Sequence, residues 1–191
     1  MTTMAENTAS TKEQFRQEFE KHIKRDGADK LWAYLEKSDF FTAPASSKFH
    51  GACAGGLVAH SLAVYRNLKK LQTSESDETI AICGLLHDLC KTNFYKLSKR
   101  NVKNAEGKWE EQPYYTIEDT LCYGHGEASV YILSSYIRLS REEALAIRWH
   151  MGGFDCAARG GERAINGAYE NYPLCAKLSC ADMLATYVDK L

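Results

Sequence analysis

Six side chains of this sequence could together bind divalent metal ions, because each is a nitrogen or oxygen donor in an apolar or glycine-flanked stretch. Imidazole and carboxylate donors without thiolate suit Mn, Fe, Ni, Co, Zn or Mg rather than a structural, cysteine-rich zinc site. Buried polar groups of this kind destabilise a fold unless a partner compensates them, and a metal ion compensates both donor types at once. The candidates are His60, His87, Asp88, His125, His150 and Asp182.

The pair His87-Asp88 is the most informative part of this set. It follows residues 79–86, TIAICGLL, which are apolar nearly all round and so are typical of a helix buried on every side. Neighbouring residues on a helix point about 100° apart, so further ligands must come from other helices. Six donors exceed what one catalytic ion takes, which favours two ions bridged by a carboxylate. The alternative is that these residues merely cap a helix end, and a single histidine on an apolar face is more often an ordinary core residue.

These donors need helices to position them, and the sequence predicts a mainly helical chain. Ser10 and Glu13 form a capping-box pattern, which predicts that the first helix starts at residue 10. The small, polar residues 1–9 are expected to be disordered. Apolar residues at helical spacing predict further helices over residues 28–37, 56–71, 79–86, 125–137, 141–150 and 173–190.

One stretch departs from the helical pattern. Residues 93–117 contain two extended-looking runs joined by Asn104–Gly107, which predicts a β-hairpin. Residues 159–171 are predicted to be irregular. Without repeats or low-complexity linkers, residues 10–191 are expected to form a single domain, an all-α bundle with one small hairpin insertion.

Composition narrows the class of protein further. The chain has 191 residues and a net charge of −1, which argues against a surface devoted to nucleic acid as a whole. No run of apolar residues is long enough to predict a membrane span, and the start has no signal-peptide core. Seven cysteines without a CxxC pair predict free thiols in a reducing cytoplasm, with those inside the apolar helix acting as small hydrophobes.

The order of the donors resembles the HD-domain superfamily of metal-dependent phosphohydrolases. The phrases GGLVAHSL, GLLHDLCK and GHGEAS and an acid in the last helix carry the resemblance, which covers roughly residues 45–190. His125 and His150 between the HD pair and the last acid resemble the binuclear subset of that superfamily. The resemblance implies a helical HD-type fold, two divalent ions and a bridging role for Asp88. It also implies that Lys91, at the HDxxK position, contacts a substrate phosphate or a bound water.

This resemblance implies hydrolysis of a phosphate ester of a nucleotide or of short single-stranded nucleic acid, by a water that the metals activate. The residues proposed to contact substrate are Lys91, His50, Arg159 and Arg163. Six basic residues between positions 91 and 108, opposed only by Glu106, could steer an anionic substrate, although such a run is more often a solvated surface.

Other side chains near the donors are given structural roles. We expect Arg148, which lies two residues before His150 and so on roughly the opposite helix face, to be structural. Tyr123, Trp149 and Phe154 flank the predicted ligands, and we expect them to belong to the core rather than to stack on a base.

Two departures from the family pattern keep alternatives open. Cyclic-dinucleotide phosphodiesterases and some HD exoribonucleases have paired histidines where this chain has His150-Met151, and the chain lacks their GYP signature. The mixed-valent di-iron oxygenases of the same superfamily have a single histidine at that station, so they are the main alternative. A binding module whose metals only stabilise the fold is a third. The substrate, the metal and the oligomeric state are not indicated by the sequence.

Overall fold

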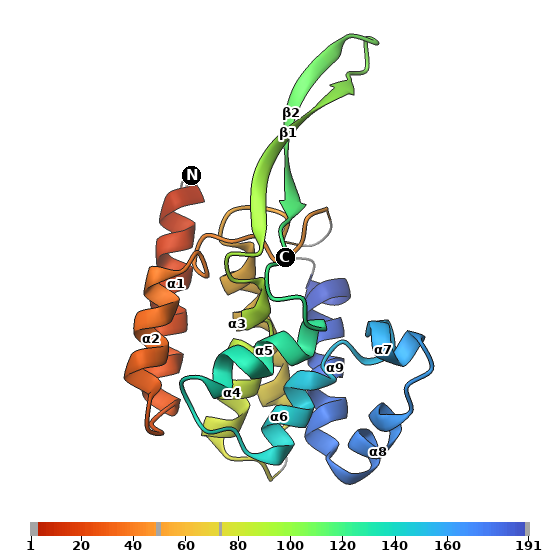
Figure 1. The fold of residues 1–191 in the computed structure, drawn as a ribbon. Coiled ribbons are helices and arrows are strands. Elements are labelled where there is room, and N and C mark those ends of the chain that lie inside the picture. Colours follow the sequence, from red (N-terminus) through yellow and green to blue (C-terminus); the bar gives the residue numbers. More distant parts are fainter. Residues whose placement is uncertain (1–3, 49–50, 73, 190–191) are drawn as a thin grey trace.

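The computed structural model describes residues 4–48, 51–72 and 74–189, and most of them are helical (Figure 1). The helical elements with their bounds are α1 Met4–His22, α2 Ala28–Lys37, α3 Gly56–Lys70, α4 Asp77–Leu86, η1 Leu89–Lys91, α5 His125–Ser134, α6 Arg141–Arg148, η2 Gly152–Phe154, α7 Cys156–Arg159, α8 Ala164–Asn171, α9 Pro173–Leu184 and η3 Ala185–Asp189. None of these helices is both long enough and apolar enough to cross a lipid bilayer.

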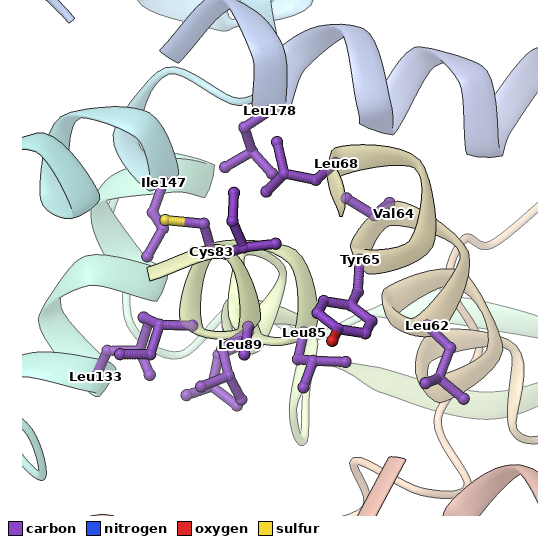
Figure 2. Packing of buried hydrophobic residues seen from close by; sticks show 14 of the residues in the cluster. Leu62, Val64, Tyr65, Leu68, Cys83, Leu85, Leu89, Leu133, Ile147 and Leu178 are labelled. Carbon is purple, nitrogen blue, oxygen red and sulfur yellow. The ribbon is translucent and has the colours of Figure 1, made fainter. Parts of the chain in front are cut away.

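Helix α4 is the centre of the helical body. Every residue from Ile80 to Leu86 is buried, which confirms the prediction of a helix covered on all sides. Apolar side chains from four neighbouring helices surround it, as Figure 2 shows. They include Leu62, Val64, Tyr65 and Leu68 from α3, Leu133 from α5, Ile147 from α6 and Leu178 from α9.

Two glycines allow these helices to approach one another closely. A Cβ atom at Gly84 of α4 would lie 2.5 Å from the Cα atom of Tyr65 in α3. A Cβ atom at Gly126 of α5 would lie 2.1 Å from the backbone oxygen of Arg148 in α6. Both positions therefore require glycine for the observed packing of α3 on α4 and of α5 on α6.

The predicted hairpin is confirmed, and it projects away from the helices (Figure 1). Strand β1, Tyr95–Lys103, pairs antiparallel with β2, Trp109–Ile117, and both strands keep one register from end to end. The Asn104 side chain accepts hydrogen bonds from the backbone of residues 106 and 108, and Gly107 has a φ of 80° that favours glycine. The fold class is therefore the one predicted, a mainly helical chain with a small hairpin insertion.

Two predicted boundaries are wrong. Helix α1 begins at Met4 rather than at Ser10, so residues 4–9 are helical, and residues 1–3 lie outside the described residues. The stretch 159–171, predicted to be irregular, contains α8, which buries Ala168 against α9. The second capping box is confirmed, because the Ser140 hydroxyl accepts a hydrogen bond from the backbone N–H of Glu143 and the Glu143 carboxylate accepts one from that of Ser140.

Candidate metal centre

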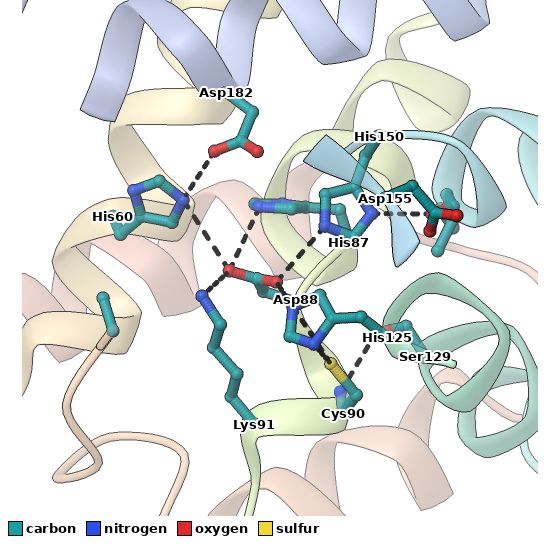
Figure 3. Close-up of polar contacts among 12 residues, drawn as sticks. His60, His87, Asp88, Cys90, Lys91, His125, Ser129, His150, Asp155 and Asp182 are labelled. Carbon is teal, nitrogen blue, oxygen red and sulfur yellow. Dashed lines mark hydrogen bonds and ion pairs between the residues drawn. The ribbon is translucent and has the colours of Figure 1, made fainter. Parts of the chain in front are cut away.

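Asp88 lies where α4 ends, and its carboxylate is the meeting point of the predicted donors (Figure 3). The side chain is only 2% exposed. Four imidazoles and one ammonium group from four separate segments face it. Measured from Nε2 or Nζ to the nearer carboxylate oxygen, the distances are 2.7 Å for Lys91, 2.8 Å for His125, 3.4 Å for His150, 3.5 Å for His87 and 3.7 Å for His60.

Asp182 joins the cluster from helix α9. Its Oδ1 atom lies 3.0 Å from Nε2 of His60, which stands between the two carboxylates in Figure 3. All six donors identified from the sequence are thus brought into one buried cluster, although they span more than a hundred positions of the chain.

Backbone carbonyls fix the orientation of two of the imidazoles. Nδ1 of His87 lies 3.1 Å from the carbonyl oxygen of Gly84, and Nδ1 of His150 lies 2.7 Å from that of Ile147. A carbonyl only accepts hydrogen bonds, so Nδ1 donates in both rings and a neutral ring keeps its lone pair on Nε2. These two Nε2 atoms are buried and have no hydrogen-bond partner among the described residues.

The electrostatics of the cluster suit a divalent cation. Burial lowers the pKa of both His87 and His125, which favours neutral imidazoles. Burial acts in the opposite sense on Asp88, but Lys91 and the neighbouring imidazoles outweigh it and hold the pKa of Asp88 well below its usual range. His87 combines an anchored Nδ1 atom with a lowered pKa and faces an ionised carboxylate, which is the arrangement found in protein metal sites, so the residues present fit a metal ion.

More than one position in the cluster could hold an ion. Among the described residues, three groups place their donor atoms within 4.8 Å of one another. Asp88 belongs to two of these groups and His87 to two. The groups are His60 with His87 and Asp88, His87 with His150 and Asp182, and Asp88 with Cys90 and His125.

Cys90 is a donor that the sequence analysis missed. It was assigned to the apolar interior with the other thiols of that segment, and helical periodicity gives no sign that it faces the cluster. The signal that could have found it is its place two residues after Asp88, inside the HDxxK segment.

Two pockets open onto the cluster from different sides. The smaller, of about 170 Å³, is lined by His60, Lys91, His150 and Asp182. The larger, of about 500 Å³, is lined by Cys90 and His125 together with Tyr123, Arg148 and Phe154, among others.

The aromatic residues beside the ligands differ in burial. Trp149 is buried, as expected. Tyr123 and Phe154 are 52% and 54% exposed and line the larger pocket, so the expectation that they belong to the core is wrong. Each ring has an aromatic neighbour, Tyr131 for Tyr123 and Tyr187 for Phe154, but about half of each side chain stays exposed.

The residues predicted to contact substrate differ in burial and in whether they line a pocket. Lys91 is buried in the cluster, whereas Arg159 and Arg163 are exposed and line neither of the two pockets. His50 lies outside the described residues. Arg148 has the structural role expected for it, because it pairs with both Glu127 and Asp155.

The excess of positive charge predicted for the hairpin is partly offset by acids on the opposite strand and next to it. Lys96 pairs with Glu118, and Lys99 lies 3.0 Å from Glu111. Antiparallel pairing places acids of the second strand beside residues 91–108, and the charge of that run alone does not include them. The prediction that this run attracts an anionic substrate is therefore weakened.

Comparison with known proteins gives one match. The model of the family described as the HD domain matches residues 57–191, which is more than half of the chain. No curated protein and no solved structure matches the chain.

Proposed function

Because this chain belongs to the HD domain family, a superfamily of metal-dependent hydrolases, we propose that it hydrolyses a phosphate ester of a nucleotide or of short single-stranded nucleic acid. The observation that carries the proposal is the pair of buried, unpartnered Nε2 atoms of His87 and His150, both facing the Asp88 carboxylate. A buried polar atom without a partner destabilises a fold, so these two atoms support the binding of a cation by this cluster.

The six clustered donors would hold two divalent ions, and Asp88 belongs to two of the candidate ligand groups. When bound, such ions supply a water whose pKa falls from 15.7 to about 7 and offset the charge of a transferring phosphoryl group. Imidazole and carboxylate donors accept Mn, Fe, Ni, Co, Zn or Mg. The ligands are His60, His87, Asp88, His125, His150 and Asp182.

Lys91 supplies a fixed positive charge beside these ligands. Its ammonium lies 2.7 Å from Asp88 and also lines the smaller pocket, where a phosphate oxygen could reach it. Contact with Asp88 raises the pKa of Lys91 above its usual value despite the opposing effect of burial, so the group is charged at neutral pH. We infer that it binds and orients the substrate phosphate.

The larger pocket supports a substrate that carries a planar ring. Tyr123 and Phe154 expose about half of their side chains there, beside His125. Bases stack on exposed aromatic side chains with little dependence on their sequence. A nucleotide with its phosphate at Lys91 and its base against one of these rings would use both pockets.

The test is a release assay on protein freed of metal and then loaded with one ion at a time. The substrates are nucleoside monophosphates, cyclic dinucleotides and short oligonucleotides. We expect turnover with at least one ion, and a loss of about 100-fold in kcat/KM in Lys91→Met. Lys96→Met is the matched control, because this exposed lysine pairs with Glu118 on the hairpin. Metal-loaded protein that releases nothing from any of these substrates would overturn the proposal.

A di-iron oxygenase is the second candidate, favoured by a particular observation at His150. The next residue is Met151, which lines both pockets and offers no imidazole, so this station has a single histidine. Iron-loaded protein that shows a mixed-valent electron paramagnetic resonance signal and consumes oxygen with a substrate would favour this reading over hydrolysis. Aerobic protein without iron and without that signal would exclude it.

A further inference from the structure

The thiol of Cys90 is part of the cluster of candidate metal ligands. Its Sγ atom is 3.3 Å from Nδ1 and 3.5 Å from Nε2 of His125, whose Nε2 is in turn 2.8 Å from Asp88 (Figure 3). The backbone N–H of Cys90 donates to the Ser129 hydroxyl at 3.0 Å, which ties this segment to α5 and so to His125. The sulfur is thus held beside two of the proposed ligands.

The surroundings of Cys90 differ from those of the other thiols. Cys83 and Cys175 are fully buried members of the apolar core, whereas Cys53, Cys122, Cys156 and Cys180 are exposed. Within the part of the chain that the structure describes, Cys90 is the one cysteine in a group of donor atoms that lie within 4.8 Å of one another.

A second observation, independent of the thiol, points to a cation in this cluster. The Nε2 atoms of His87 and His150 are buried and unpartnered, and both face Asp88, the carboxylate that Cys90 and His125 share. The need for a cation therefore arises from residues other than the thiol.

We propose that Cys90 is a thiolate ligand of one of the two ions, together with Asp88 and His125. This inference rests on the metal-binding part of the proposed function and not on its substrate. On binding, the S–H bond breaks, the sulfur keeps the electron pair and donates it to the ion, and the proton leaves to solvent, as in other metal-bound thiols.

Thiolate ligation makes the two ion positions chemically different. The group of His60, His87 and Asp88 offers nitrogen and oxygen, while the group with Cys90 adds a soft sulfur. Thiolates select zinc and similar ions over magnesium, which prefers oxygen alone. The position at Cys90 is therefore expected to retain zinc, cobalt or ferrous iron in the presence of excess magnesium.

The test is titration of the metal-free protein with cobalt, followed by absorption spectroscopy. We expect a sulfur-to-cobalt charge-transfer band in the near ultraviolet from the wild type. Cys90→Ser should lose the band and bind the corresponding ion at least about 10-fold more weakly. Cys156→Ser is the matched control, because this exposed thiol lines the same pocket and should leave the band unchanged.

A second measurement needs no variant. X-ray absorption at the zinc edge of the wild-type protein should show sulfur in the first coordination shell, which guards against a Cys90→Ser variant that fails to fold. Bound cobalt or zinc without a sulfur signal would overturn the ligand role of Cys90 and leave the proposed hydrolase intact. A wild type that binds no ion at all would overturn both.

Discussion

The two ends of helix α4 both carry buried charge, but their hydrogen bonding differs. At its first turn, Glu78 pairs with Arg25, which also pairs with Glu143 of α6. At its last turn the chain passes into His87 and Asp88. The same buried helix thus joins two charged clusters in one fold.

In the cluster of Arg25, Glu78 and Glu143 at the first turn, the carboxylate oxygens all accept hydrogen bonds, and we call it the closed cluster. Arg25 donates to both oxygens of Glu143, at 2.8 and 3.0 Å, and to Glu78 at 3.3 Å. The remaining acceptor sites are used as well, because Glu143 accepts from Thr79 and Ser140 and Glu78 accepts from the backbone of residues 24 and 25. Such a network needs no ligand and stabilises the packing of α1, α4 and α6.

The cluster around Asp88 at the last turn contains buried nitrogen atoms without hydrogen-bond partners in the part of the chain that the structure describes, and we call it the open cluster. The buried Nε2 atoms of His87 and His150 have no hydrogen-bond partner among the described residues, and both face the ionised carboxylate of Asp88. The comparison shows that burial of charge does not by itself indicate a site. The informative feature is a set of buried donor atoms that the protein leaves without partners.

The largest effect is expected from Asp88→Ala, which removes the shared carboxylate. Loss of a residue that only supports a metal ligand already weakens metal affinity about 10- to 100-fold, so we expect loss of both ions and more than about 100-fold of hydrolysis. Elemental analysis and phosphate release measure the two quantities. Asp29→Ala, an exposed acid in α2, is the control. A variant that keeps two ions per chain would contradict the bridging role.

Arg25→Met should break the closed cluster, and we expect it to lower stability without affecting metal binding. Glu143 is only 1% exposed, and loss of its partner should lower the free energy of unfolding by about 3 kcal/mol. The metal content and the turnover per folded molecule should stay unchanged. Urea unfolding of this variant is compared with that of Lys99→Met, which affects an exposed pair on the hairpin and should change stability little. An equal loss in both variants would contradict the structural role.

Removal of metal should lower the Tm of the protein through the open cluster alone. An ion at about 100 times its Kd stabilises the folded state by about 2.7 kcal/mol, which corresponds to roughly 5 to 10 °C in Tm for a chain of this size. Thermal melts with and without a chelator should show this shift in the wild type and also in Arg25→Met. An unchanged wild-type Tm would show that no ion is needed there, and would exclude a module whose metals only stabilise the fold.

The smallest effect is expected from pH acting on the closed cluster. Burial raises the pKa of Glu143, but Arg25 and the other donors outweigh it, so the pKa lies below the ordinary 4.5. The stabilisation from a lowered carboxyl pKa is complete above 4.5 and is lost as pH falls through the folded value. The free energy of unfolding in urea should therefore fall between pH 6 and pH 3, and the fall should be smaller in Glu143→Gln. A pH dependence that Glu143→Gln leaves unaltered would contradict this assignment.

The sequence predicts best what depends on local pattern. The apolar run 79–86 predicts a covered helix because no face of it is polar, and the turn residues 104–107 predict the hairpin. It predicts helix starts less well. The Ser10 pattern does not begin α1, because the preceding residues favour helix too, and α8 contains asparagine and glycine yet forms by packing against α9.

The sequence predicts which six donors form the candidate site, but not how their rings are oriented or that Cys90 joins them. The types and order of six donors are visible along the chain, and the apolar context of each indicates burial. Which nitrogen of each ring faces Asp88 depends on carbonyls of neighbouring turns, and the position of Cys90 beside His125 depends on how η1 meets α5. Both are tertiary relations, and periodicity along one segment does not contain them.

The two close-packed glycines have a consequence for the span of the metal centre. Gly84 lets α3 and α4 touch, and these helices carry His60 and lead into His87; Gly126 does the same for α5 and α6, which carry His125 and lead into His150. One added methyl group at either position would move a pair of imidazoles apart. Two residues without any side chain thus keep the segments that carry the four imidazoles at their observed spacing.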